Sequence, residues 1–176
     1  LEGTQARIMK MGGLVEQAIL DAAKALDTRD QELADKVRAG DKAIDDLEEL
    51  LNEEAARVIA LRAPTAIDLR VILSVMRMSA NLERIGDLAK NLAKRNAVLM
   101  TMPSMNGSTS QLRRMYRDVQ VMLKDALASY IQRDEARARD GIELDLDIDQ
   151  LYNTLLREFM NLMLHDPRHI TPSLHH

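Results

Sequence analysis

Residues 69–89 read LRVILSVMRMSANLERIGDLA, and this stretch decides the fold class. Its apolar residues recur at the three- and four-residue spacing of an α-helix. They form two rows: one holds Leu69, Ile72, Leu73, Met76 and Ala80, and the other holds Val71, Val75, Met78, Leu82, Ile85 and Ala89. A helix with two apolar rows packs on both sides. The stretch therefore predicts a central helix of an all-α bundle.

The flanking sequence predicts more long helices, separated by short breaks. We expect helices over about 4–26, 30–62, 66–99, 111–131 and 135–165. Asp30 is a predicted N-cap, Pro64 ends the second helix, and Thr65 with Asp68 has the spacing of a capping box. Pro103 and Gly107 mark a linker between the third and fourth helices.

The chain repeats itself after 104 residues. Aligned positions include Met11 with Met115, Asp41 with Asp145, Asp45 with Asp149, Leu47 with Leu151, and Leu51 with Leu155. We therefore predict a three-helix repeat over 4–100, a linker over 101–109, and a second repeat over 110–176. Thr171-Pro172 has the pattern of another helix start, close to the last residue printed. The second repeat is expected to be incomplete at its third helix.

Composition excludes several classes of protein. Apolar residues make up 46%, charged residues 30% and aromatic residues 2%, which suits a helical core of aliphatic side chains and Met. The net charge is −4, and no basic block or aromatic platform predicts nucleic-acid binding. Cysteine is absent, so thiolate metal sites and disulfides are excluded. No apolar run approaches the length of a membrane span, and we expect a cytoplasmic protein.

Two rows of acidic residues carry the candidate chemistry. Asp41 and Asp45 lie four residues apart on one predicted helix, and so do Glu83 and Asp87 on the next. Each row continues into apolar residues on the same face; Glu48 extends the first. Carboxylates that converge between two helices suit oxygen-preferring cations such as Mg, Mn, Fe or Zn.

Two other interpretations of the acidic rows remain open. The carboxylates can form salt bridges with Arg70, Arg77 or Arg84, or they can be solvated near one end of the bundle. The late histidines, at 165, 169, 175 and 176, are interpreted as part of a polar loop and chain end. The ferritin-like Glu-x-x-His pattern does not occur in the sequence.

Two sequence stretches resemble the PhoU family. One is Ala63-Pro64-Thr65-Ala66-Ile67-Asp68-Leu69-Arg70, and the other is Asn81-Leu82-Glu83-Arg84-Ile85-Gly86-Asp87. The start of the chain at 11–18 and the segment 165–175 are also similar to this family.

This resemblance implies a fold, a function and a set of ligands. It implies two tandem three-helix bundles and a non-enzymatic, cytoplasmic negative regulator of phosphate homeostasis. Such a protein couples the ATPase subunit of the phosphate transporter to a sensor histidine kinase, and reaches the membrane only through these partners. A homodimer is also expected. The implied ligands of a divalent or trivalent metal ion are Asp41, Asp45, Glu83 and Asp87, with Asp145 and Asp149 in the second repeat.

Two alternative functions stay open at this point. One is a carboxylate-bridged metalloenzyme built in a helix bundle. The absence of a Glu-x-x-His pattern makes redox chemistry less favoured than structural metal binding. The other is a purely structural helical adaptor, in which the acidic residues only form salt bridges.

Overall fold

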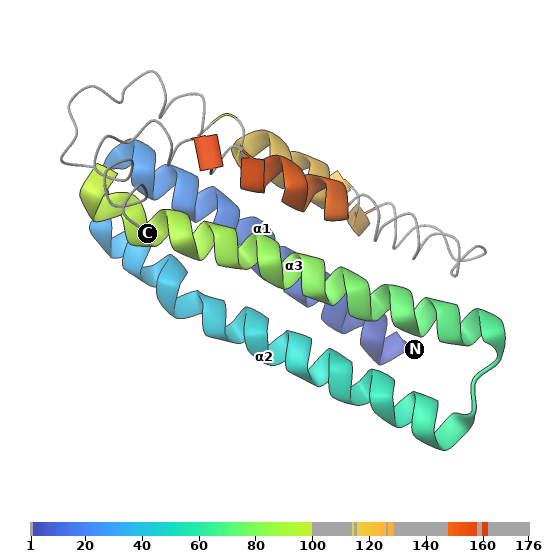
Figure 1. Ribbon diagram of the computed structural model, residues 1–176. Coiled ribbons are helices and arrows are strands. Elements are labelled where there is room, and N and C mark those ends of the chain that lie inside the picture. The colour runs from blue at the N-terminus through green and yellow to red at the C-terminus, as the bar shows by residue number, and fades with distance from the viewer. Residues whose placement is uncertain are drawn as a thin grey trace, which may run out of the picture.

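The computed structural model describes residues 2–99 without a gap, together with 114, 116–125, 127–128, 148–157 and 160–161. Three long helices dominate it: α1 (Glu2–Thr28), α2 (Gln31–Arg62) and α3 (Ala66–Leu99). They run alternately up and down in one bundle (Figure 1). All-helical structure confirms the predicted fold class. The predicted linker at 101–109 lies outside the described residues.

The breaks between the helices follow local chemistry. The carboxylate Oδ1 of Asp30 accepts a hydrogen bond from the Leu33 amide at 3.1 Å, which caps α2 as predicted. The Thr65 hydroxyl accepts a hydrogen bond from the Asp68 amide at 3.3 Å at the start of α3. Ala63 ends α2 in the left-handed region, directly before Pro64. These contacts fix where each helix ends and therefore how α2 and α3 are aligned.

One row of α3 forms the core, and the other is only partly covered. Val75, Met78, Leu82, Ile85 and Ala89 are all buried, as predicted. On the second row Ile72 is buried, whereas Leu73 is 41% exposed. The prediction of two buried faces is therefore confirmed for one row and only in part for the other, where Leu73 is exposed.

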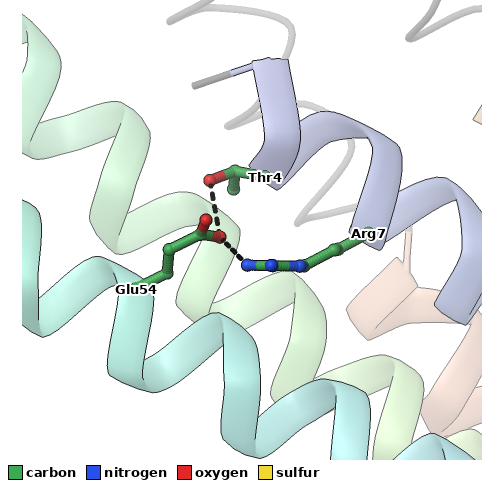
Figure 2. Close-up of polar contacts among 3 residues, drawn as sticks. All are labelled: Thr4, Arg7 and Glu54. Carbon is green, nitrogen blue, oxygen red and sulfur yellow. Dashed lines mark hydrogen bonds and ion pairs between the residues drawn. The ribbon is translucent and has the colours of Figure 1, made fainter.

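Polar contacts join the first residues of α1 to α2. Glu54 of α2 pairs with the Arg7 guanidinium and accepts a hydrogen bond from the Thr4 hydroxyl at 3.3 Å. Figure 2 shows both α1 side chains pointing toward the same carboxylate. The ion pair is partly exposed to solvent.

The helical segments at 116–125, 127–128 and 148–157 lie alongside this bundle (Figure 1). The repeat period of 104 residues reappears in their burial. Residues one period apart are buried in both repeats: Val15 and Val119, Ile19 and Leu123, Ile44 and Ile148, Leu47 and Leu151, and Leu51 and Leu155. Equivalent positions also touch: Gln120 donates a hydrogen bond to Glu16, its counterpart one period earlier. Equivalent positions of the two repeats thus meet directly at this contact.

None of the helices in the described part of the chain is long and apolar enough to cross a membrane.

Candidate metal centre between α2 and α3

Asp41 is the acidic residue that the fold encloses most completely. It lies on the face of α2 that packs against α3, and only 4% of its surface is exposed. Its neighbour Ile44, on the same face of α2, belongs to the core. A carboxylate in such a place is costly unless a cation or hydrogen-bond donors compensate its charge.

Gly86 of α3 makes room for this carboxylate. A Cβ atom at position 86 would lie 3.7 Å from Oδ1 of Asp41 and 3.1 Å from Cδ1 of Ile44. A larger side chain would thus meet both the charged group and the core residue beside it. The missing side chain allows α2 to pack closely at this level.

The two oxygens of Asp41 have different surroundings. Oδ2 pairs with the ammonium of Lys90, on α3, at 3.4 Å. Oδ1 is buried and has no hydrogen-bond partner among the described residues. A buried acceptor without a partner is uncommon in native proteins and calls for an explanation. Here it leaves one carboxylate oxygen whose hydrogen-bonding capacity is not met by the described residues.

The surrounding acids oppose each other's ionisation. Burial raises the pKa of Asp41, the charge of Asp45 raises it further, and Lys90 acts in the opposite direction. The pKa of Glu83 rises to about 7 because of burial, followed by the charges of Glu48, Asp45 and Asp87. Burial and Asp45 likewise raise the pKa of Glu48, whereas Arg84 lowers it. The acids of α2 and α3 thus share one electrostatic environment in which the effects of burial and of neighbouring acids outweigh those of Lys90 and Arg84.

The predicted metal ligands of the first repeat differ in how deeply they are buried. Asp45 is exposed, whereas Glu83 and Asp87 are partly buried. Asp87 accepts a hydrogen bond from Asn91 at 3.5 Å. Within the described residues, no group of three or more acidic or histidine side chains is arranged as a metal site. The four carboxylates are therefore electrostatic neighbours that do not converge on one point.

The second repeat contributes only part of its predicted pair. Asp149 is exposed and accepts a hydrogen bond from Asn153 at 3.5 Å. Asp145 and the late histidines lie outside the described residues.

Arginine did not supply the charge that faces Asp41. The guanidinium of Arg84 lies over the ring of Tyr152, 5.7 Å from its centroid, and so joins α3 to the second repeat. Lys90, which sequence reasoning did not single out, provides the ion pair instead. Its spacing carried a signal: Lys90 follows Asp87 by three residues and Glu83 by seven, on the same helical face.

Comparison with known proteins identifies the family of this chain. The PhoU domain profile matches residues 8–95 and 112–174. The chain belongs to the PhoU family. The resemblance inferred from the sequence is thereby confirmed, together with an all-α fold that contains two PhoU segments.

Curated PhoU relatives match nearly the whole chain. A phosphate-specific transport system accessory protein PhoU homologue from Caulobacter vibrioides is 39% identical over 170 residues, which are 97% of this chain and 74% of the relative. A homologue from Aquifex aeolicus, also with this protein name, is 39% identical over 175 residues, 99% of this chain and 79% of the relative.

Solved PhoU structures agree with the fold. The crystal structure of PhoU from Pseudomonas aeruginosa superposes with a TM-score of 0.72 at 36% identity, and the match covers 99% of this chain and 83% of that one. The phosphate transport system regulatory protein PhoU from Streptococcus pneumoniae has a TM-score of 0.66 at 20% identity, covering 90% of each chain. This second likeness concerns the fold alone.

Proposed function

We propose that this protein is a non-enzymatic accessory regulator of phosphate transport. The observation that carries the proposal is the match of nearly the whole chain to relatives whose names state an accessory role in phosphate-specific transport. The fold supports it, since long helices with acidic and apolar faces offer extended surfaces to other proteins.

The regulator acts between two partners in this proposal. It binds the ATPase subunit of the phosphate transporter and a sensor histidine kinase in the cytoplasm, and it represses the phosphate-starvation response when phosphate is plentiful. It forms a homodimer and meets the membrane only through these partners.

The acidic face binds a divalent or trivalent metal ion, of which Fe, Zn, Mn and Mg are candidates, as part of the same proposal. Asp41, Asp45, Glu83 and Asp87 would hold it in the first repeat, and Asp145 with Asp149 would contribute in the second. The four carboxylates of the first repeat do not converge on one point among the described residues, but two observations favour a cation between them. Oδ1 of Asp41 is buried without a partner among the described residues. Burial raises the pKa of Asp41 and of Glu83, and neighbouring acids raise both pKa values further. A bound cation would supply the positive charge that these carboxylates lack.

A genetic test separates the regulatory role from the metal role. A strain without the gene is complemented with the wild-type chain, with Asp41→Asn, or with Glu54→Gln as a matched control on the same helix. A reporter driven by phosphate starvation is then measured in high phosphate. We expect repression by the wild-type chain and by Glu54→Gln, and loss of repression with Asp41→Asn.

Each outcome decides one part of the proposal. Failure of the wild-type chain to repress would contradict the regulatory role. Full repression by Asp41→Asn would leave that role intact and contradict its dependence on metal. Co-purification of the transporter ATPase with the wild-type chain checks the partner directly.

A further inference from the structure

We propose that two copies of this chain associate through the outer face of α2, with the two α2 helices antiparallel across a two-fold axis. The proposal rests on the homodimer proposed above and adds the surface that forms it. The occupant of this face is a second copy of the chain.

A row of exposed side chains runs along α2 on the side away from the bundle core. Residues three or four positions apart share one face of a helix, and five such residues form the outer row of α2: Asp46, Leu50, Glu53, Arg57 and Leu61. Leu50 is 44% exposed and Leu61 is 76% exposed. The buried residues of α2 lie on the opposite face, among them Ile44, Leu51 and Ala55.

The outer row is open in the described structure. Figure 1 shows α2 on the opposite side of the bundle from the helical segments of the second repeat. Within the described part of the chain, no ion pair or side-chain hydrogen bond engages Glu53 or Arg57. These two charged residues are therefore available to another molecule.

The sign of the charge changes along α2. Every charged residue from 45 to 54 is acidic, and both charged residues from 57 to 62 are arginines. A helix with oppositely charged halves is complementary to a copy of itself that runs in the opposite direction. A copy that runs in the same direction would place acids against acids. The charge pattern therefore selects the antiparallel arrangement.

The spacing of the row sets the register of this contact. Leu50 and Leu61 are equally distant from a two-fold axis that passes between Ala55 and Ala56, so each Leu50 meets Leu61 of the second copy. Glu53 lies just before the axis and Arg57 just after it, so these two residues meet between the copies. Symmetry makes every contact occur twice. The row is about 23 Å long, which is short for an interface, so we expect dissociation on the order of micromolar.

The main experiment mixes two charge-reversed variants of the full chain. Arg57→Glu leaves only acids at the centre of the contact, and Glu53→Arg leaves only arginines there. Alone, each variant should associate at least about tenfold more weakly than the wild type, because like charges meet. An equimolar mixture should associate at least as tightly as the wild type, because opposite charges then face each other. Sedimentation velocity over a concentration series measures all of these.

A matched control and the possible outcomes separate this surface from the dimer itself. Arg38→Glu makes the same charge change on an exposed part of α2 outside the contact and should leave association unchanged. A wild-type dimer that neither Arg57→Glu nor Glu53→Arg weakens would overturn the α2 surface and leave the homodimer in place. A monomeric wild type would overturn both, while the reporter test decides the regulatory role separately. Pairing of Glu53 with Arg57 within one helix cannot make the mixture associate, so a mixture that stays monomeric would overturn the antiparallel contact.

A disulfide tests the register independently. The chain contains no cysteine, so Leu50→Cys combined with Leu61→Cys introduces its only two thiols. They lie about 17 Å apart along one helix, which is too far for a disulfide within one chain. Mild oxidation should link two copies covalently, as seen on a non-reducing gel, whereas Leu50→Cys alone should stay unlinked. Absence of the linked dimer would overturn the proposed alignment of the two helices.

Discussion

Helix α2 carries two carboxylates that contact neighbouring helices, and their surroundings are opposite in kind. Glu54 is partly exposed and receives both a guanidinium and a hydroxyl from α1 (Figure 2). Asp41 is buried among other acids, with one oxygen paired and the other without a partner among the described residues. The comparison separates a structural carboxylate from a candidate binding group. Glu54 has its partners within the fold, whereas one oxygen of Asp41 has no partner among the described residues.

The largest effect is expected from filling the space beside Asp41. Gly86→Leu places side-chain carbons where Ile44 and Asp41 already lie, so overpacking should destabilise the protein by about 3 kcal/mol. Gly86→Ala is the control, because its Cβ requires Ile44 to yield by only a few tenths of an ångström while helix propensity improves. Urea unfolding measures both variants. Equal stability of the two would show that the close approach at Gly86 is not needed.

The next effect concerns metal affinity and compares the two carboxylates directly. Asp41→Asn keeps the size of the side chain but removes its charge, and we expect it to weaken Mn²⁺ binding by about a hundredfold. Glu54→Gln should leave the affinity unchanged, because Glu54 already has Arg7 and Thr4 as partners. Calorimetric titration checks both. A similar loss in the two variants would show that Asp41 and Glu54 do not differ in metal binding.

A smaller effect should appear in the pH dependence of stability without metal. The pKa of Glu83 is raised from 4.5 to about 7 in the fold, so the folded chain binds this proton more tightly than the unfolded chain does. Its contribution to stability is present below about pH 4.5 and is lost as pH rises through about 7. Asp41 and Glu48 shift in the same direction.

Urea unfolding in chelator at about pH 5 and about pH 8 measures this dependence. The wild type should lose more stability between these two values than Glu83→Gln does. Parallel losses in the two proteins would show that Glu83 is not responsible. Mn²⁺ added at the higher pH should restore stability, because it supplies the opposing charge.

The smallest effect on stability is expected at Glu54. Arg7→Ala removes a partly exposed ion pair and should cost at most about 1 kcal/mol, less at high salt. Thermal melting at low and high salt measures it. A larger loss of stability that does not depend on salt would show that Glu54, like Asp41, behaves as a buried charge.

Sequence reasoning found the helices because their signals are local. Asp30 and Thr65 cap helices through contacts within one turn, and the buried row of α3 follows from periodicity alone. The acidic face was found only in part. Asp41 and Asp45 lie four residues apart and were assigned to one row. Over four residues a helix rises about 6 Å, and the second side chain points about 40° away from the first. One can therefore be buried while the other is exposed.

The pairing of Asp41 with Lys90 could not be read from the sequence. It depends on which turn of α3 lies opposite which turn of α2, and the α2–α3 corner sets that alignment. Spacing placed Lys90 on the correct face, whereas only the packed structure places it opposite Asp41.

Glu16 and Gln120 occupy the same position in the two repeats and hydrogen-bond to each other. In a dimer of identical subunits, a residue on the symmetry axis meets only its own copy, and two glutamates there would repel each other. Joining the halves in one polypeptide removes that restriction. An acid can then face an amide, and the contact between the two repeats becomes attractive. A tandem chain can thus place complementary side chains where two identical subunits would place the same residue twice.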